Sequence, residues 1–175
     1  MTDPPAPRRR LVIHPEEVLR RRAEPVEAFD ESLRELVDDL AALMKAHRGA
    51  GIAAPQAGES LRVFLAAAEN PEDPPTVFVN PRLHDFSPDS AMATEGCLSL
   101  PEIEGQVMRP KAVAVTACDL EGREFTLHSD GFPARVWQHE MDHLDGVLII
   151  DRMRMLDRLA NRRAIRELEQ AAAGT

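Results

Sequence analysis

The sequence predicts a single α+β domain in which antiparallel strands pack around one central helix. Its 175 residues suit one domain with a sizeable core. Short apolar runs between turn residues indicate strands, and they do not alternate with helices as a parallel sheet requires. Between the Asp130-Gly131 turn and Gly146, apolar side chains lie on most sides of a helical pattern, which is typical of a buried helix.

The first third of the chain is expected to hold a flexible arm and an amphipathic helix. Residues 1–10 form the arm, and the domain spans residues 11–170. Apolar residues 11–13 suggest a short strand that ends at Pro15, because a residue before proline is pushed to extended geometry. The helix begins near Asp30, which can cap it, and ends near Gly49. Its core-facing stripe consists of Leu33, Leu36, Val37, Leu40, Leu43 and Met44.

The rest of the chain is predicted to be mainly strands, followed by a C-terminal helix. Polar residues 82–94 are expected to be irregular, and turn residues 119–122 join two strands into a hairpin. A final helix over 153–170 is predicted to contact the body through Met155, Leu156, Leu159, Ile165 and Leu168. The expected strands cover residues 61–65, 76–79, 112–118, 123–128 and 147–150.

Composition and charge exclude several classes of protein. No apolar run approaches the roughly 20 residues of a membrane helix. The N-terminus lacks a hydrophobic stretch of signal-peptide length, so we expect a cytoplasmic protein, and a monomer. The net charge of −9 disfavours a general nucleic-acid binder. In the cytoplasm the two cysteines, Cys97 and Cys118, are not expected to form a disulfide.

The central helix carries an HExxH motif at residues 139–143. Positions four apart share a helix face, so His139 and His143 can offer ring nitrogens to one metal ion. Glu140 lies beside them as a possible general acid or base. Pro133 suits the first helical turn and Gly146 a left-handed stop. The alternative is a core helix whose histidines bond to backbone carbonyls.

A catalytic site of this kind needs a third protein ligand. No histidine follows His143, and the strongest upstream candidate is Cys97. A thiolate with two imidazoles suits Fe²⁺, Zn²⁺, Ni²⁺ or Co²⁺. In a zinc endopeptidase, the third ligand would instead be Glu167 or Glu169.

Three motifs together resemble those of one known family, the peptide deformylases. They read GAGIAAPQ at 49–56, EGCLS at 95–99 and HEMDH at 139–143, in the family's order and spacing. The resemblance extends to residues 20–30 and to Arg109, and it covers roughly residues 11–152. It implies hydrolysis of the N-formyl group from the initiator N-formylmethionine of nascent polypeptides, with release of formate.

The resemblance also implies roles for individual residues. Cys97, His139 and His143 would bind one divalent metal, which is expected to be Fe²⁺ in the cell, with Zn²⁺, Ni²⁺ or Co²⁺ in purified protein. The metal would activate water, and Glu140 would take the water proton and pass it to the leaving amine. The Gln56 side-chain amide and the Leu98 backbone N–H would hold the oxyanion.

The substrate would bind as an added strand, which needs little side-chain recognition. Its backbone would pair with Ala50, Gly51 and Gly96. Phe132 and Val136 are candidates to line the methionine pocket. Glu95 and Asp142 are candidate partners for the two histidines.

Some residues depart from the family pattern. Ala50 stands where valine or isoleucine is usual, Ile52 where leucine is usual, and Trp137 where smaller aliphatics are common. None of these changes removes a ligand or the acid, so they bear on pocket shape and substrate preference.

The segment from Arg152 to Arg166 is strongly basic. It has six arginines and one acid, a charge of +5, which leaves −14 for the rest of the chain. This segment is either a solvated helix face or, as the resemblance suggests, a ribosome contact that attracts RNA phosphates. Besides the endopeptidase, a non-catalytic binding module on the same fold is the remaining alternative.

Overall fold

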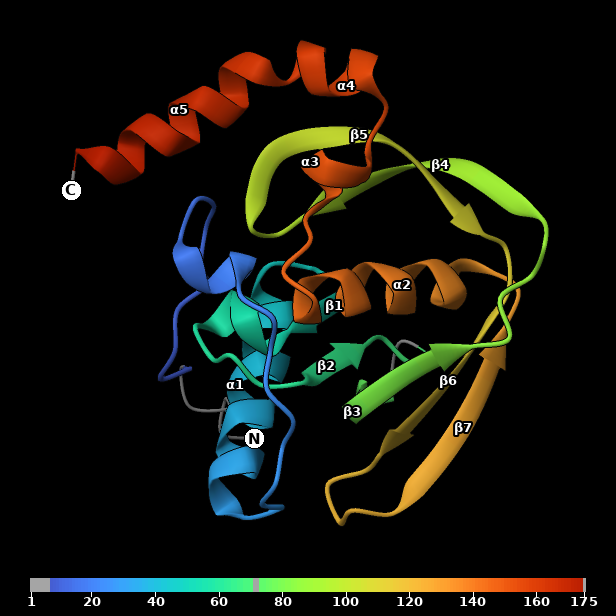
Figure 1. Ribbon diagram of the computed structural model, residues 1–175. Coiled ribbons are helices and arrows are strands. Elements are labelled where there is room, and N and C mark those ends of the chain that lie inside the picture. Colours follow the sequence, from blue (N-terminus) through green and yellow to red (C-terminus); the bar gives the residue numbers. More distant parts are fainter. Residues whose placement is uncertain (1–6, 71–72, 175) are drawn as a thin grey trace.

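Two antiparallel sheets lie on either side of a buried helix in the computed structural model, which describes residues 7–70 and 73–174 (Figure 1). The larger sheet has the strand order β1-β2-β3-β6-β7, and the smaller sheet is the β4-β5 hairpin. This is the α+β architecture that the sequence predicts. The strands are β1 (Gly51–Ala53), β2 (Val63–Ala66), β3 (Thr76–His84), β4 (Ser90–Cys97), β5 (Leu100–Pro110), β6 (Val113–Cys118) and β7 (Glu124–Ser129).

Five α-helices and two short 3₁₀ helices complete the described fold. The central helix α2 begins with Pro133 in its first turn, as predicted, and Gly146 has the expected left-handed conformation, with φ 73°. The amphipathic helix α1 is capped by Asp30, whose carboxylate accepts the backbone N–H groups of Ser32 and Leu33. The helices are η1 (Glu17–Arg20), α1 (Glu31–Ala46), η2 (Ala54–Ala57), α2 (Phe132–Leu144), α3 (Ile149–Arg152), α4 (Met155–Ala160) and α5 (Arg162–Ala173).

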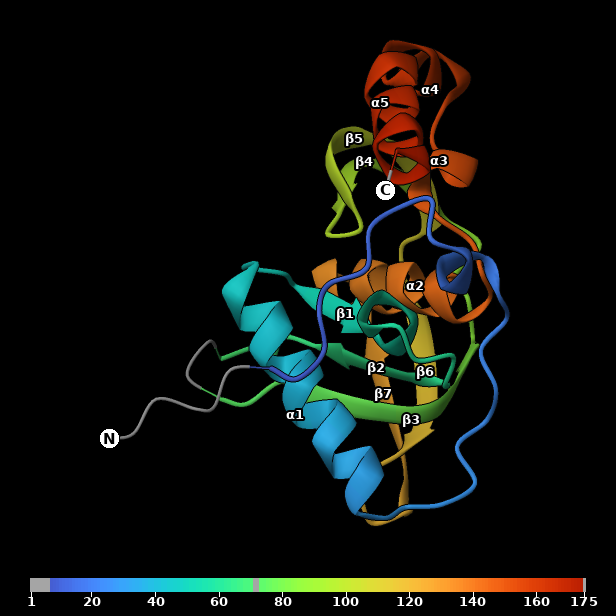
Figure 2. The same cartoon turned by 90° about the vertical axis from the view of Figure 1, so that its left-hand side faces the viewer.

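The larger sheet is covered on both faces, by α1 on one side and α2 on the other (Figure 2). All four residues of β2 are therefore buried. Val63 and Leu65 point toward α1, whereas Phe64 points toward α2, as the two-residue period of a strand requires. The Phe64 and Phe78 rings stack with centroids 4.5 Å apart. This packing fixes α2, and hence its motif residues, against the sheet.

A third apolar cluster joins the β4-β5 hairpin to the ends of the chain. Ile165 and Leu168 of α5 pack against it as predicted, together with Val12 from the N-terminal segment. The His14 imidazole lies 3.4 Å from the Glu169 carboxylate of α5. The C-terminal helix is thus held on the hairpin that carries the cysteine motif.

The predicted strand at 11–13 is wrong, although the segment is extended. The Val12 N–H donates to the Gln56 carbonyl (2.8 Å), and the His14 N–H donates to the Ser99 carbonyl (2.9 Å). Because these bonds go to two separate elements, no ladder forms. Through these two hydrogen bonds the segment instead links the motif at residues 49–56 to the motif at residues 95–99.

The predictions for residues 82–94 and 147–150 also need correction. β3 continues to His84, and β4 begins at Ser90, with Ser90, Met92 and Thr94 among its exposed residues. The predicted strand 147–150 is replaced by the start of α3, where the Leu148 N–H donates to the Asp151 carboxylate (2.9 Å). An apolar run of four residues is compatible with either structure, and the local cap decides.

The predicted single C-terminal helix is in fact two helices, which meet at Asn161. The Asn161 side chain donates to the Glu104 carbonyl of β5 (2.8 Å) and to the Asp157 carbonyl (2.8 Å). Met155, Leu156 and Leu159 are 85%, 72% and 53% exposed, so their predicted contact with the body is wrong.

The N-terminal arm is described only from residue 7, because residues 1–6 lie outside the described part of the chain. The Arg8 backbone N–H donates to Asp39 (2.9 Å), and the Arg9 guanidinium pairs with Asp39 and Glu59. The boundary at residue 10 stays a prediction. Among the residues that the structure describes, no helix is long and apolar enough to cross a membrane.

Replacing Gly146 by alanine should destabilise the fold. The backbone at Gly146 is left-handed, a conformation that is strained for a residue with a Cβ. A Cβ at this position would also lie 2.6 Å from the Arg20 carbonyl oxygen. We expect the free energy of unfolding to fall by about 2 kcal/mol or more. Urea denaturation with excess chelator measures this without a contribution from metal binding. The control is Gly174→Ala, where the nearest atom would be 3.8 Å away, and an equal loss there would contradict the explanation.

Candidate active site

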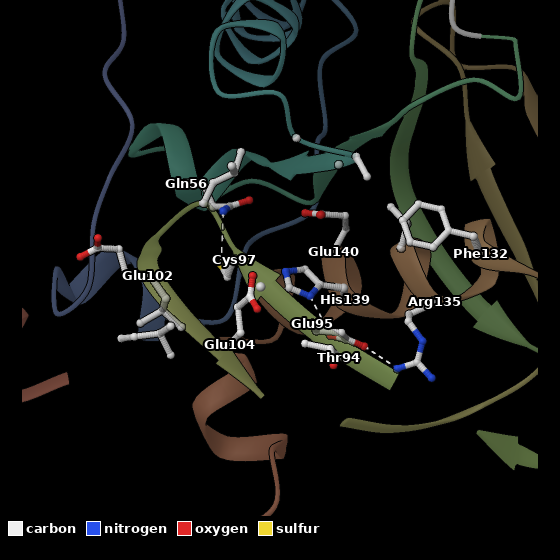
Figure 3. A pocket seen from close by; sticks show the side chains of 18 of the residues that line it. Gln56, Thr94, Glu95, Cys97, Glu102, Glu104, Phe132, Arg135, His139 and Glu140 are labelled. Carbon is white, nitrogen blue, oxygen red and sulfur yellow. Dashed lines mark hydrogen bonds and ion pairs between the residues drawn. The ribbon is translucent and has the colours of Figure 1, made fainter. Parts of the chain in front are cut away.

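A pocket of about 690 Å³ lies between β1, the β4-β5 hairpin and α2 (Figure 3). It brings together the three sequence motifs, which are far apart in the chain. His143 is 1% exposed and lies beneath the pocket surface. All the other residues expected to act in the site line the pocket: Ala50, Gly51, Gln56, Gly96, Cys97, Leu98, Phe132, Val136, His139 and Glu140.

The three expected metal ligands converge at the floor of this pocket. Each offers one ligand atom, and these atoms all lie within 4.8 Å of one another. The Cys97 Sγ lies 3.3 Å from the His143 Nε2. The two histidines follow from helical spacing, whereas Cys97 is placed by a register shift where β4 ends. A thiolate and two imidazoles in this arrangement fit a divalent transition metal.

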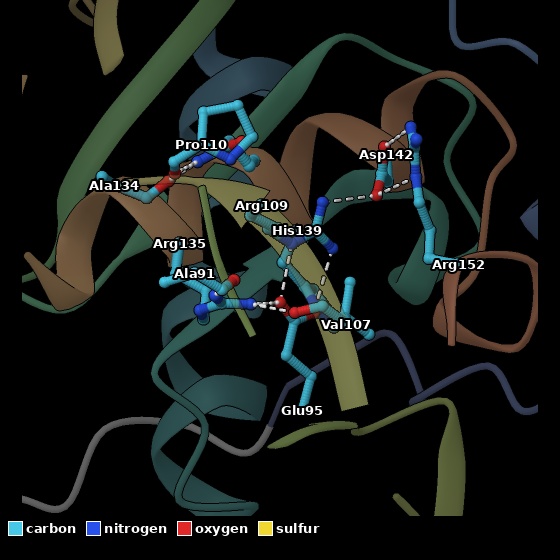
Figure 4. A network of polar contacts seen from close by, with 11 residues as sticks. Ala91, Glu95, Val107, Arg109, Pro110, Ala134, Arg135, His139, Asp142 and Arg152 are labelled. Carbon is cyan, nitrogen blue, oxygen red and sulfur yellow. Dashed lines mark hydrogen bonds and ion pairs between the residues drawn. The ribbon is translucent and has the colours of Figure 1, made fainter. Parts of the chain in front are cut away.

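A buried carboxylate fixes the orientation of His139. Glu95 Oε2 lies 2.9 Å from the His139 Nδ1, which leaves the Nε2 for the centre. Glu95 also receives the Arg109 guanidinium at 2.6 and 2.9 Å and the Arg135 guanidinium at 2.7 Å (Figure 4). Of the two candidate histidine partners, Glu95 therefore holds this role.

The other candidate, Asp142, bonds to arginines and not to a histidine. Arg109 donates to it at 2.9 Å, and Arg152 of α3 donates at 2.6 Å. Figure 4 shows the resulting chain from Arg152 through Asp142, Arg109 and Glu95 to His139. The His143 Nδ1 is buried and has no hydrogen-bond partner among the described residues.

Burial and neighbouring charges shift the pKa values of the carboxylate and the two imidazoles of the site in different directions. Burial opposes the ionised form of Glu95, but hydrogen bonds from His139 and Arg109 outweigh it and hold the pKa of Glu95 well below its usual range. Burial likewise lowers the pKa of His139, but the Cys97 thiol and Glu95 raise it well above its usual value. Burial lowers the pKa of His143, which favours the neutral imidazole that a metal requires.

Gln56 is held so that its amide group faces the ligands. Its Oε1 accepts the Ala53 backbone N–H (2.9 Å), and its Nε2 donates to the Ser99 hydroxyl at 3.1 Å and approaches the Cys97 Sγ at 3.7 Å. The side chain is buried. The donor end of the amide thus faces the Cys97 thiol.

Glu140 is a buried carboxylate with unused hydrogen-bonding capacity. Its Oε2 has no hydrogen-bond partner among the described residues. Burial raises the pKa of Glu140 to about 7, although the charges of His139 and Arg109 oppose this rise. The carboxylate lies against β1, where a Cβ at Gly51 would be 2.5 Å from its Oε1. Only a glycine at this position leaves room for Glu140.

Two strand edges that face the pocket have no partner strand among the described residues. β1 ends the larger sheet and β4 pairs only with β5, and residues from both line the pocket. An unpaired strand edge of this kind is the feature to which an extended peptide adds in strand-addition complexes. Phe132 is 68% exposed at the rim, and Val136 lies one helical turn further along α2.

Of the three departures from the motif pattern, only Ala50 lines the pocket. Ile52 and Trp137 are buried in the core, and the Trp137 ring lies 5.9 Å from that of Phe78. A change in pocket shape is thus confined to the position of Ala50.

Sequence reasoning missed several pocket residues. Arg135 is four residues before His139, so helical spacing could have placed it on the motif face. Glu102 and Glu104 could not have been found in this way, because the strand that carries them, β5, was not predicted. Thr94 and Asn161 also line the pocket.

The carboxylates required by the endopeptidase hypothesis are engaged elsewhere. Glu167 pairs with Arg163 at 2.8 Å, and Glu169 lies against His14. Within residues 7–70 and 73–174, the group that could hold a metal is Cys97 with the two histidines. The geometry therefore does not support Glu167 or Glu169 as the third ligand.

Known proteins are similar to this chain over most of its length. Residues 8–159 match the polypeptide deformylase family model. A peptide deformylase from Thermotoga neapolitana is 40% identical over 165 residues, which are 94% of this chain and 99% of that protein. A chloroplastic peptide deformylase 1B from Solanum lycopersicum is 42% identical over 82% of this chain and 52% of its own length. The crystal structure of Plasmodium falciparum peptide deformylase superimposes with a TM-score of 0.90 at 35% identity, covering 95% of this chain and 98% of that one.

Replacing Arg109 by methionine should strongly destabilise the protein. The side chains of Arg109, Glu95 and Asp142 are 5%, 6% and 11% exposed, so the change would leave two buried carboxylates short of a counter-charge. We expect the free energy of unfolding to fall by about 3–5 kcal/mol in chelator-treated protein. In the control Arg123→Met, the lost ion pair with Asp119 lies on the surface, and we expect no comparable change. Similar losses in both variants would contradict a special role for the buried network.

Proposed function

This chain belongs to the peptide deformylase family, and from that premise we propose how its own residues carry out the reaction. Its activity is the removal of the N-formyl group from nascent peptides. The observation that carries the proposal is the convergence of Cys97, His139 and His143 beside buried Glu140, whose Oε2 has no hydrogen-bond partner among the described residues. Both the endopeptidase and the non-catalytic module are thereby set aside.

Cys97, His139 and His143 would hold one divalent metal ion. The ion supplies Lewis-acid activation of water at neutral pH. The thiolate in the donor set is compatible with Fe²⁺, which we propose for the cell, and equally with Zn²⁺, Ni²⁺ or Co²⁺ in purified protein. Glu95 supports the site by fixing the His139 ring.

Glu140 is proposed as the group that moves the proton. Its free Oε2 can accept a proton from the attacking water and later donate it to the leaving amine of methionine. A pKa raised by burial to about 7 suits a group that must both take and give a proton near neutral pH. The contact with Gly51 limits where the carboxylate can move.

Gln56 and Leu98 are proposed to stabilise the oxyanion that develops on the formyl oxygen. The Gln56 amide is oriented by Ala53 and Ser99 before any substrate arrives, so little reorganisation is needed. Leu98 lines the pocket next to Cys97, where its backbone N–H would be the second donor.

The substrate peptide is proposed to bind as an extended strand along β1 and β4. The backbones of Ala50, Gly51 and Gly96 would provide the hydrogen bonds, which are independent of the peptide sequence. The methionine side chain would pack against Phe132 and Val136. The absence of a larger side chain at Ala50 widens this end of the pocket.

The decisive experiment measures formate released from formyl-Met-Ala-Ser by protein loaded with Fe²⁺ or Ni²⁺ without oxygen. The wild type should release formate, and absence of release with either metal would overturn the proposal. Glu140→Ala should retain the metal and lose about 10²–10⁴ in kcat, because proton transfer contributes that factor. Loss of metal together with activity would assign Glu140 a structural role. Metal content by mass spectrometry separates the two results.

The oxyanion role predicts a different kinetic signature for Gln56. We expect Gln56→Ala to bind the same amount of metal and to lose about 10²–10³ in kcat. Ser99→Ala removes only the hydroxyl that helps to orient Gln56 and leaves the amide donor in place, so its loss of kcat should be smaller. A Gln56→Ala protein with normal kcat would exclude the amide as an oxyanion donor.

We propose further that the enzyme acts as a cytoplasmic monomer on chains emerging from the ribosome, and that its C-terminal helices contact the ribosome. Exposed Met155 and Leu156 on α4 and the arginines of α5 support such a contact. Arg152 is less available for it than the arginines of α5, because its guanidinium is bonded to Asp142. Among the described residues, Arg162 and Arg166 have no ion pair.

Neutralising Arg162, Arg163 and Arg166 to glutamine should weaken cosedimentation with ribosomes, because fewer phosphates are neutralised. A control with Arg21, Arg34 and Arg123 changed to glutamine removes the same charge from other surfaces. If both triple variants cosediment as well as the wild type, the contact does not involve this helix.

A further inference from the structure

A second pocket, of about 490 Å³, lies against a different face of α2 from the active site. Its α2 residues include Gln138, Met141 and Asp142, whereas His139 and Glu140 line the active-site pocket. The two pockets share no lining residue. A cavity of this volume is in the range that holds a small-molecule ligand, and the proposed reaction assigns it none.

Arginines outnumber acids in the wall of this second pocket. Four arginines and two aspartates carry its charge: Arg22, Arg62, Arg109, Arg152, Asp142 and Asp145. Asp142 alone faces both Arg109 (2.9 Å) and Arg152 (2.6 Å), as Figure 4 shows, and Asp145 pairs with Arg62 (3.0 Å). Arg82 is not counted, because its guanidinium pairs with Glu124 of β7. The wall is therefore positive, in a chain whose net charge is −9.

Two of these guanidinium groups have unused N–H donors. The exposed Arg22 side chain has no hydrogen bond or ion pair in the part of the chain that the structure describes. Arg152 uses its Nε and Nη2 on Asp142, which leaves its Nη1 without a partner among the described residues. Each nitrogen of Arg109, by contrast, already donates to Glu95 or Asp142. Arg22 and Arg152 are thus the groups that can receive an anion, and two guanidiniums match a phosphate dianion.

Large apolar side chains line the same pocket and remain exposed. Phe86, in the segment between β3 and β4, is 51% exposed, and Met108 of β5 is 54% exposed. Pro81 and Leu83 of β3 and Pro110 of β5 complete this apolar wall. A phenyl ring and a thioether in one pocket offer a surface on which a flat aromatic ring can pack. The second pocket therefore combines an apolar wall with free cationic donors.

From this combination we infer that the second pocket binds a phosphate ester with an aromatic ring, the class to which nucleoside monophosphates belong. Arg22 and Arg152 would bind the phosphate, and Phe86 and Met108 would pack against the ring. The cavity volume suits one such molecule, so the ligand is a free nucleotide and not a longer RNA strand. The pocket lies apart from the metal ligands, and the inference therefore does not depend on the proposed function.

The test titrates isotope-labelled, Zn²⁺-loaded protein with AMP, adenosine and inorganic phosphate while backbone amide signals are followed by two-dimensional NMR. AMP should shift the signals of Phe86, Met108 and Asp145 and leave those of Gly51 and Gly96 unchanged. It should bind about tenfold or more tightly than adenosine, because hydrogen bonds to a charged group contribute about that factor. Its affinity should fall as the salt concentration rises. A 5′-phosphorylated oligoadenylate should bind no more tightly than AMP.

The inference is overturned if millimolar AMP leaves the three amide signals unchanged. It is also overturned if AMP shifts the signals of Gly51 and Gly96 instead, because the phosphate then binds at the metal site. Adenosine or inorganic phosphate that binds as tightly as AMP would exclude the aromatic phosphate as the ligand class. Tighter binding of the oligoadenylate would assign the pocket to RNA in place of a free nucleotide.

Two exposed side chains separate the contributions of the phosphate and the ring. Arg22→Gln should weaken AMP binding about two- to fivefold and leave adenosine binding unchanged, because it removes only a charge. Phe86→Ala should weaken the binding of both ligands. The matched control is Arg162→Gln, which removes from α5 an exposed arginine that has no ion pair among the described residues. An equal loss in Arg162→Gln and Arg22→Gln would show that net charge suffices and would overturn the site.

Discussion

The Glu95 carboxylate connects the two structural units that form the active site. It belongs to β4, two residues before the cysteine ligand, and it bonds to His139 on α2. Arg109 and Arg135 hold it from β5 and α2, so neither oxygen can move without breaking an ion pair. The distance between the cysteine and the histidines therefore depends on this buried group. A charge in such a place is tolerated only because its partners surround it.

Gly51 and Gly96 lack side chains at positions where another residue's side chain lies close to the backbone. Gly51 leaves room for the Glu140 carboxylate, and Gly96 leaves a gap that the Glu104 side chain crosses. In both cases the backbone belongs to a strand edge that has no partner strand among the described residues, where we propose that the peptide binds. Gly51 thus leaves space for the Glu140 carboxylate, and both glycines leave the backbone accessible to a peptide.

The C-terminal helices are tied to the substrate pocket through β5. Asn161 bonds to the Glu104 carbonyl, and the Asp157 carboxylate accepts the Gln106 backbone N–H at 3.0 Å. Arg152 reaches the network around the metal ligands through Asp142. The basic segment, which looks like a separate appendage in the sequence, is therefore part of the framework that holds the pocket mouth.

The sequence by itself determined the family and the α+β class, and it predicted the two histidines as ligands with the carboxylate of Glu140 between them. These depend on local spacing: residues 139 and 143 share a helix face in any α-helix, and the stripe on α1 follows the same period. How the predicted third ligand, Cys97, comes to lie beside the histidines was decided by the tertiary structure. So were the choice of Glu95 as the partner of His139 and the approach of Glu104 to Gly96. Cys97 and Glu95 are placed by the pairing of β4 with β5, and β5 carries no strong local signal. Segments 11–13 and 147–150 were mispredicted because apolar composition does not reveal hydrogen-bond partners. Residues 11–13 bond to residues far away in the chain. Residues 147–150 are part of a helix start that Asp151 caps.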